Sequence, residues 1–389
     1  MAIYLAILTL VTLFFSNKLW GFLDTPDSDS RQRASSLDGL RGYLALSVML
    51  HHAVIARQWL NTGRWSLPPD WFYAQLGSIA VSVFFMITAY LFWGKLLSRN
   101  GRMDWKRLYI GRLYRIAPLY WIAVSCVVFI VFARSGFQIN QAPNELMAEL
   151  VHWYAVGLLV QHDFNGYQNV WILTAGVLWT LKYEWKFYLA LMPASLLARP
   201  RLHLAASFCL LLIAAICSYS LKSDNWSYCT LFAIGMLTAS LQREKLILAI
   251  PNNIASTLAA LIIIFVINGS KTPYSIMQSL PLGLAFMLIA NGASLFGLLS
   301  SRPAIRLGHA SYGIYLLHGL TLAICFDNLL LRPLIASSNL NFWAATGLAA
   351  ILVSAIAAIL HILVERPMME RGRQPKQRKS QQPQAIANP

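Results

Sequence analysis

The sequence predicts an all-α, polytopic membrane protein. Only 12% of its 389 residues are charged and 57% are hydrophobic, whereas a soluble domain is about 25% charged. Apolar runs of about 20 residues, each long enough to cross a hydrocarbon core of about 30 Å, recur to the end of the chain. The length therefore does not indicate a string of soluble domains, because nearly every apolar run belongs to one helical bundle.

The predicted bundle has a ten-helix core in residues 36–367 and one extra N-terminal transmembrane helix in residues 1–23. The extra helix lacks a basic start and a small-residue cleavage site, so it is expected to be an uncleaved span. A polar linker, residues 24–35, follows it. A basic tail, residues 368–389, is expected to be disordered because it is polar and rich in Gln, Pro and Lys. The core spans are expected at about 39–59, 74–97, 113–133, 179–198, 203–221, 226–241, 246–268, 275–298, 311–331 and 342–363.

The basic residues in alternate loops predict the orientation. The loops on one side, together with the tail, hold 19 Lys and Arg residues, whereas eight Lys and Arg residues make up most of the basic charge of the opposite loops. Basic loops stay in the cytoplasm, so we expect a cytoplasmic C-terminus and a periplasmic N-terminus in a bacterial inner membrane. The one long outer segment, residues 134–170, contains the short apolar stretch Val151–Val160, which is either interfacial or re-entrant.

Composition also excludes other classes of protein. The net charge of +16 lies in short loops, as membrane orientation demands, and no basic helix stands outside the spans, so nucleic-acid binding is not expected. All five cysteines fall in or beside apolar spans without a CxxC pair or a Cys/His metal spacing. We expect no disulfide, no metal and no permanently bound cofactor.

The first core helix places ionisable residues where they are costly. It begins at LDGLRG, with Asp38 and Arg41, and runs to His51 and His52. His52 lies about 16 Å along the axis from Arg41, near the middle of the membrane. Adjacent residues of a helix point about 100° apart, so at most one of the two histidines faces a given cavity. A buried neutral imidazole suits a general base or a proton relay, although a lone buried histidine is often only a packing residue.

Three further segments carry polar groups into apolar helices. In RLYR, Arg112 and Arg115 share one helical face, which suits either membrane anchoring or the bidentate binding of phosphates. WTLKYEWKFY contains Trp179 and Glu184, both expected at the outer mouth. Glu184 is expected as a catalytic carboxylate that reaches a polar cavity to orient a base or bind sugar hydroxyls, or else only forms an ion pair with a neighbouring lysine, and Trp179 is expected as a stacking face for a sugar. SYGIYLLH opens the ninth core span and supplies the pocket candidates Ser311, Tyr312, Tyr315 and His318.

Together these segments resemble the acyltransferase 3 family of integral-membrane acyltransferases, which includes O-antigen and exopolysaccharide acetylases. Arg41 and His52, separated by ten residues, resemble its Arg-x10-His signature, and RLYR resembles its R-x-x-R motif. The segments beginning at Trp179 and Ser311 are similar to its later signatures. The resemblance runs from about Ser36 to Pro367, and the four motifs occur in the family's order.

The resemblance implies an acyl-CoA donor and a carbohydrate acceptor, met at opposite faces of the membrane. It implies that His52 is the catalytic histidine and that Arg41, Arg112 and Arg115 bind the donor. One departure concerns packing: the chain reads Ile-Thr-Ala-Tyr-Leu at 87–91, with Thr88 and Ala89 where the family usually has Ser-Gly. A glycine there would permit close approach of a neighbouring helix.

The expected function is therefore O-acyl transfer, with acetyl as the expected group and His52 as the base. His52 would take the proton of the acceptor hydroxyl or carry the acyl group itself, and the sequence leaves both open. Thr88, Tyr312 and Tyr315 are candidates for stabilising the oxyanion. The alternatives are a glycan-lipid flippase, polymerase or transporter without acyl-CoA chemistry, and a sensor on the same fold. Membrane lipid is an expected partner, and the oligomeric state stays open.

Overall fold

The computed structural model describes residues 1–24, 32–269, 272–326 and 331–372. In these ranges the chain forms helices and contains no β-strand, apart from one isolated bridge between Phe164 and Tyr167. The all-α prediction is confirmed. Residues 25–31 of the predicted linker and 373–389 of the predicted tail lie outside the described residues.

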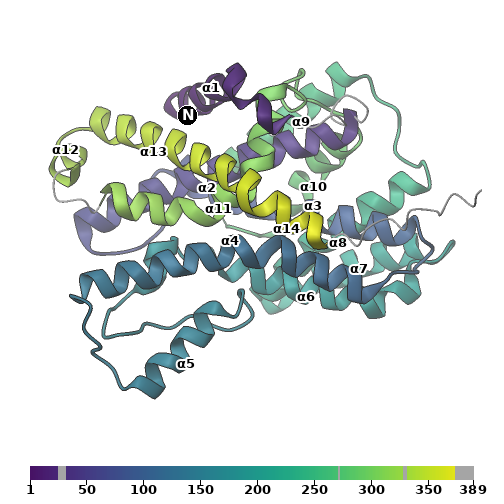
Figure 1. Cartoon of the computed structure of the whole chain (residues 1–389). Coiled ribbons are helices and arrows are strands. Elements are labelled where there is room, and N and C mark those ends of the chain that lie inside the picture. The colour runs from purple at the N-terminus through teal and green to yellow at the C-terminus, as the bar shows by residue number, and fades with distance from the viewer. Residues whose placement is uncertain (25–31, 270–271, 327–330, 373–389) are drawn as a thin grey trace, which may run out of the picture.

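Each of the ten predicted core spans overlaps one helix (Figure 1). These helices are α2 (Gln32–Thr62), α3 (Trp71–Leu97), α4 (Trp105–Arg134), α6 (Trp179–Ala194), α7 (His203–Leu221), α8 (Asp224–Arg243), α9 (Asn252–Gly269), α10 (Ile276–Ala290), α11 (Arg302–Phe326) and α13 (Asn339–Leu360). Seven of them, α2, α3, α4, α7, α9, α11 and α13 with its continuation to Gly372, are long and apolar enough to cross a membrane. The chain is a multi-pass membrane protein.

Shorter elements complete the order. The extra N-terminal segment is the apolar helix α1 (Ala2–Ser16) with the 3₁₀ helix η1 (Lys18–Leu23). The outer segment contains α5 (Pro143–Tyr154) and the 3₁₀ helix η3 (Val170–Thr174). The remaining elements are η4 (Ser195–Leu197), α12 (Leu331–Ser337), the π turn η5 (His361–Glu365) and α14 (Arg366–Gly372).

Within the described residues, helices α2 and α11 pack against each other more extensively than any other pair of helices. A Cβ atom added to Gly308 would stand 2.0 Å from the backbone oxygen of Asp38, and one added to Gly42 would stand 2.8 Å from the Gly308 nitrogen. Only glycine allows such an approach, and small residues are what lets membrane helices pack backbone to backbone. This contact places the two histidine-bearing helices side by side.

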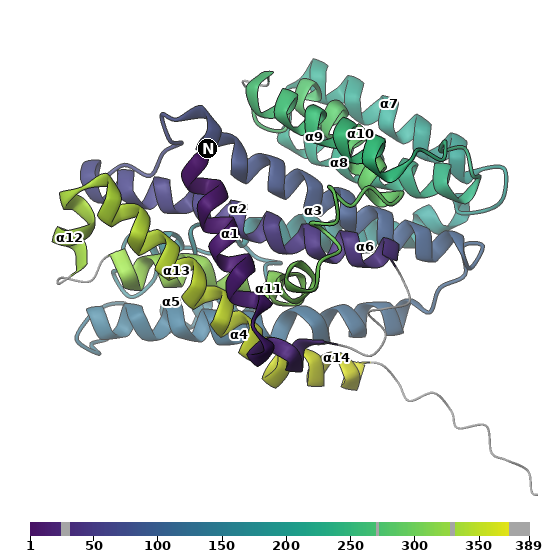
Figure 2. The ribbon, with the colours of Figure 1, turned by 90° about the horizontal axis from the view of Figure 1, so that it is seen from above.

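Helices α7 to α10 form a group on the other side of α3 (Figure 2). In this group α8 packs closely on α3. This contact explains why α3 can carry Ala89 at the position where the family usually has glycine. The Ala89 side chain is fully buried, and a Cβ on Gly235 of α8 would lie 2.8 Å from it and 2.3 Å from the Met86 carbonyl. The glycine that permits close approach is therefore supplied by α8 instead of α3.

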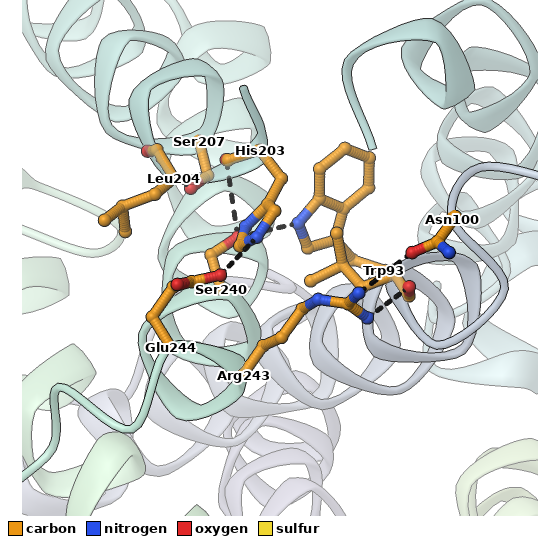
Figure 3. A network of polar contacts seen from close by, with 9 residues as sticks. Trp93, Asn100, His203, Leu204, Ser207, Ser240, Arg243 and Glu244 are labelled. Atoms are coloured by element: carbon orange, nitrogen blue, oxygen red, sulfur yellow. Dashed lines mark hydrogen bonds and ion pairs between the residues drawn. The ribbon is translucent and has the colours of Figure 1, made fainter. Parts of the chain in front are cut away.

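A polar network joins α3, α7 and α8 near the ends of these helices (Figure 3). The Trp93 Nε1–H donates to Ser240 Oγ at 2.9 Å, and the His203 imidazole lies 2.9 Å from the Glu244 carboxylate. Arg243 donates to the Leu97 carbonyl and to the Asn100 side chain at the end of α3. These bonds give partners to the buried Trp93, His203 and Ser240 side chains and fix the register of the three helices.

The extra helix α1 crosses the bundle beside α11 and α13 (Figure 2) and is fastened by Arg306 of α11. The buried Arg306 guanidinium donates to both carboxylate oxygens of Asp24, at 2.6 and 2.7 Å, and to the carbonyls of Phe15 and Asn17. The hydrogen bonds from Arg306 hold the pKa of Asp24 below its ordinary value. Arg306, expected only as a basic loop residue, is a structural clamp.

The outer segment contacts the bundle at two places. In the stretch Val151–Val160 the side chains of Val151, Leu158 and Val160 are exposed, whereas those of Trp153 and Val156 are buried, so one face of the stretch packs on the bundle. The 3₁₀ helix η3 is enclosed: Val170 and Thr174 are buried, and η3 packs on α11. Consequently α6 begins inside the bundle.

Candidate active site

A cavity of about 400 Å³ opens between α2, α3, α4, α6 and α11, at the end of the bundle where α2 begins. We call it the arginine pocket. Eight of the twelve site residues selected from the sequence line it: Arg41, Thr88, Arg112, Arg115, Glu184, Ser311, Tyr312 and Tyr315. Side chains from five helices that are far apart in the sequence therefore meet in one place.

Two of the arginines are oriented by neighbours within the pocket. Arg41 is partly exposed and lies 3.7 Å from the carboxylate of Asp38, one helical turn earlier. The Arg112 guanidinium lies 4.8 Å from the centre of the Phe92 ring and 6.0 Å from that of Tyr188, which suits cation–π contact. Both cations remain accessible from the cavity.

Arg115 is held by a carboxylate that sequence reasoning did not select. Glu365 is buried, and its Oε2 lies 3.9 Å from the Arg115 guanidinium and 3.3 Å from His361 Nδ1. It sits in the π turn His361–Glu365, and such turns redirect side chains and recur at functional sites. Within the described residues Glu365 Oε1 has no hydrogen-bond partner, so the polar contacts of this buried carboxyl group are made at Oε2, with His361 and Arg115.

Glu184 lies in the arginine pocket, not at the opposite mouth where the sequence placed it. The Tyr188 hydroxyl donates to Glu184 Oε2 at 2.9 Å. The physical reason for the different position is that η3 carries the chain inward before α6 starts, so the carboxylate sits deeper than a span beginning at the membrane surface would place it. Glu184 thus lies opposite a cluster of guanidinium groups.

Trp179 lines neither this pocket nor the distal cavity described below. Its ring lies 5.0 Å from that of Tyr228 and 5.6 Å from that of Tyr183, in an aromatic cluster with Tyr274. The structure places the residue expected as a sugar-stacking face in the packing between α6 and α8.

The two histidines of α2 have different neighbours. His51 Nδ1 lies 2.8 Å from the Tyr73 carbonyl, and its ring packs so closely on α3 that a Cβ on Gly77 would stand 2.6 Å from it. His52 instead faces α11, with His52 Nδ1 at 3.1 Å from His318 Nε2. One histidine therefore packs against α3 while the other pairs with α11, as their 100° separation on the helix requires.

The backbone partners assign the protons of the His52–His318 pair. His52 Nδ1 lies 3.0 Å from the Val48 carbonyl and His318 Nδ1 lies 3.2 Å from the Ile314 carbonyl, and a carbonyl can only accept. Each Nδ1 therefore carries the proton, and His318 Nε2 accepts from His52 Nδ1–H. His52 Nε2, which has no hydrogen bond to any described residue, retains its lone pair.

The histidine pair adjoins the arginine pocket through Tyr315. The Tyr315 ring lines the pocket and lies 6.1 Å from the His318 ring. Its hydroxyl donates to the Val177 carbonyl at 3.2 Å and lies 2.9 Å from Thr180 Oγ1. Tyr315 is thus held in place by these contacts, and its side chain lies between the arginine pocket and His318.

A second cavity, of about 270 Å³, lies at the far end of α2 and α11, and we call it the distal cavity. Trp59 and Trp65 line it, together with Tyr167, Gln168 and Asn169 of the outer segment. The Trp65 ring is stacked on the His52 ring at 6.3 Å between centroids, with 25° between the planes. His52 therefore lies between the two cavities. It stacks on Trp65 of the distal cavity, and it is connected through His318 to Tyr315 of the arginine pocket.

One cluster has the composition of a metal site, although no metal was expected. Ligand atoms of Glu149, His152 and His162, on α5 and the loop after it, lie within 4.8 Å of one another. His162 Nδ1 is 3.0 Å from the Glu149 carboxylate, and His152 Nδ1 is 2.9 Å from the Val160 carbonyl. These contacts engage one nitrogen of each imidazole, and the cluster lies outside the two cavities.

Several known proteins are similar to this chain in sequence. A family model described as an acyltransferase domain, that of the acyltransferase 3 family, matches residues 35–360. A Rhizobium meliloti exopolysaccharide production protein is 27% identical over 322 residues, covering 77% of this chain and 91% of that protein. A Komagataeibacter xylinus protein, provisionally named a membrane-bound transacylase, is 26% identical over 370 residues, covering 89% and 86%.

A Bacillus subtilis protein, provisionally named a peptidoglycan O-acetyltransferase, is 23% identical over 374 residues, covering 86% of this chain. The chain spans only about half of that relative, 55% of its length. No solved structure matches the chain. The family match covers most of the ten-helix core, including the arginine pocket and the histidine pair, and the chain therefore belongs to the acyltransferase 3 family of membrane acyltransferases.

Proposed function

We propose that the protein transfers an acetyl group from acetyl-CoA, bound at the arginine pocket, to a hydroxyl of a cell-surface or periplasmic carbohydrate that enters from the distal cavity. The observation that carries the proposal is the position of His52 between two cavities at opposite ends of the bundle. The relatives named for peptidoglycan O-acetylation and exopolysaccharide production support a carbohydrate as the acceptor.

The arginine pocket suits the donor. Coenzyme A carries phosphates, and guanidinium groups bind phosphate oxygens through paired N–H donors. Arg41, Arg112 and Arg115 supply three such groups at one mouth, and the apolar wall beyond them, including Phe84 and Ile87, suits the pantetheine arm. In this arrangement the thioester points toward Tyr315 and the histidine pair.

In the proposed step His52 Nε2 takes the proton of the acceptor hydroxyl as its oxygen attacks the thioester carbonyl carbon. The C–O bond forms and the C–S bond breaks; the coenzyme A thiolate leaves and receives the proton from the His52 imidazolium. Hydrogen bonds from His52 Nδ1–H to the Val48 carbonyl and to His318 stabilise that imidazolium.

The other pocket residues are assigned supporting roles. The hydroxyls of Tyr312 and Tyr315 donate to the backbone carbonyls of Ile116 and Val177. Thr88 Oγ1 lines the pocket and makes no hydrogen bond to any described residue, so we assign Thr88 to the oxyanion. Glu184 balances the guanidinium cluster and orients Tyr188 beside Arg112.

The proposed orientation follows from the basic loops. The arginine pocket faces the cytoplasm, where acetyl-CoA is made, and the distal cavity faces the periplasm. Tyr4 of α1 packs on Phe72 at the start of α3, so the N-terminus lies at the periplasmic end in this arrangement.

The test is acetyl transfer by the purified protein. Reconstituted wild type and His52→Ala are given radiolabelled acetyl-CoA and oligosaccharides cut from the surface polysaccharide of a strain lacking the protein. Loss of the base is expected to slow transfer by about 10²–10⁴-fold. His162→Ala, which changes an exposed histidine outside both cavities, should transfer at the wild-type rate. A folded His52→Ala protein as active as this control would overturn the proposal.

A further inference from the structure

The distal cavity has the composition of a sugar-binding site. It combines aromatic faces from Trp59, Trp65 and Tyr167 with amide groups from Gln168 and Asn169. A pyranose ring has apolar C–H faces and a rim of hydroxyls, so it needs aromatic surface together with donors and acceptors. At about 270 Å³ the cavity is close to the lower bound of about 300 Å³ for small-molecule sites, which suits one sugar residue of a longer chain.

The loop that carries the amide groups is held in place before any ligand binds. Both carboxylate oxygens of Asp163 accept backbone N–H groups, from Asn169 and Val170, at 2.9 Å each. The buried Asn165 ties the same loop to the segment after α4, because its Nδ2 donates to the Gln138 carbonyl at 2.9 Å. The site is therefore preorganised, which lowers the entropic cost of binding.

Arg134 adds a third support. Its guanidinium donates to the Tyr167 hydroxyl and lies 5.6 Å from the centre of the Tyr167 ring. The contact joins the end of α4 to the loop and orients the Tyr167 ring at the cavity. A charged donor at the rim also suits the hydroxyl-rich edge of a carbohydrate.

The wall of the distal cavity formed by α11 lies next to the histidine pair that contains the proposed base, His52. Gly319 lines the cavity directly after His318, and a Cβ there would stand 2.3 Å from the Thr174 carbonyl carbon, so α11 and η3 touch at this point. One turn of α11 therefore supplies both the cavity wall and the partner of His52. Trp65 completes the connection, because its ring is stacked on that of His52.

We propose that the distal cavity binds the sugar residue that accepts the acyl group, with Trp65 as its stacking face and Gln168 and Asn169 as hydroxyl partners. This inference rests on the proposed function. It assigns sugar stacking to a loop tryptophan between α2 and α3 instead of Trp179, which lies outside the cavity.

The test separates acceptor binding from donor binding. Steady-state transfer to the surface oligosaccharides is measured for the reconstituted full-length protein, with acceptor and acetyl-CoA varied in turn. Trp65→Ala is expected to raise the acceptor KM by about tenfold, the effect of losing one aromatic contact, while the acetyl-CoA KM stays unchanged. Trp65→Tyr should recover part of the loss because it restores a ring.

Trp226→Ala is the matched control, since Trp226 is a half-buried tryptophan at the start of α8 outside both cavities. Asn169→Ala, which alters an exposed side chain, decides the matter if Trp65→Ala does not fold. An acceptor KM in Trp65→Ala and Asn169→Ala equal to that of the control would overturn the inference. Absence of transfer by the wild type would instead overturn the proposed function itself.

Discussion

Replacing His318 with alanine removes the acceptor that faces His52 Nδ1 and tests whether the histidine pair works as a unit. In the wild type the His52 Nδ1–H is shared between the Val48 carbonyl, at 3.0 Å, and His318 Nε2, at 3.1 Å. A hydrogen bond to a charged group contributes about 1.5–3 kcal/mol. In the proposed step His52 is charged only while it holds the acceptor's proton, so His318→Ala should lower kcat by about 10- to 150-fold and leave both KM values close to wild type.

His318→Gln separates positioning from packing. The glutamine Oε1 can occupy the place of the imidazole Nε2 and accept the same hydrogen bond, so this variant should recover much of the lost kcat. The assay is reconstituted acetyl transfer, with thermal unfolding measured in parallel. Equal kcat losses in His318→Ala and His318→Gln, accompanied by equal losses of stability, would show that His318 only packs, and the reasoning about the proton on His52 would be refuted.

Three further substitutions test other parts of the account. Arg112→Ala should raise the acetyl-CoA KM by about tenfold, and Arg112→Lys should recover only part of it because a lysine cannot bind phosphate through paired donors; equal KM values for both variants and wild type would contradict donor binding there. Glu365→Gln removes the carboxylate charge beside the Arg115 guanidinium, and should cost about 3 kcal/mol, measurable as a lower unfolding temperature; an unchanged temperature would show that the pair is not stabilising. Arg306→Ala should release α1, detected as faster proteolysis after that helix. In the wild type the ion pair of Asp24 with Arg306 stabilises the docked α1 fully above an ordinary carboxyl pKa of about 3.9. This stabilisation is lost as the pH falls through the lower pKa of Asp24 in the folded protein. Protection of α1 from proteolysis that does not change with this acidification would contradict the clamp.

The helices and the grouping of the three arginines were predictable because the physical signals are local. A membrane span needs length and hydropathy, and both are visible in any window of the sequence. Arg41, Arg112 and Arg115 could be grouped because the alternation of basic loops put them at the same end. Their meeting in one cavity, however, depends on glycine contacts such as that between Gly308 and Asp38, which sequence spacing does not reveal.

The positions of Glu184 and Trp179 could not be predicted, because they depend on where the chain enters the bundle. The sequence showed an apolar helix from residue 179, but not the buried turn before it that moves its start inward. Trp65 was missed for a related reason. It lies in a loop without periodicity, and its contact with His52 depends on how that loop folds back.

Glu365 was interpreted from the sequence only as part of a helix end with an ion pair, because a π turn, which brings its carboxylate to Arg115, has no sequence signature. Ala89 shows the converse case. Its departure from the family pattern suggested altered packing, but the close approach of α3 and α8 is supplied by Gly235 on the partner helix. Compensation of this kind can be recognised only when both helices are seen together.

The central claim is that donor and acceptor reach His52 from opposite faces of the membrane. It is tested most directly with sealed proteoliposomes that contain surface oligosaccharides in the lumen and receive radiolabelled acetyl-CoA only from outside. The account predicts that the luminal oligosaccharides become acetylated while the acetyl-CoA stays outside, and that His52→Ala abolishes the label. Acetylation only when acetyl-CoA and oligosaccharide share one compartment would contradict it.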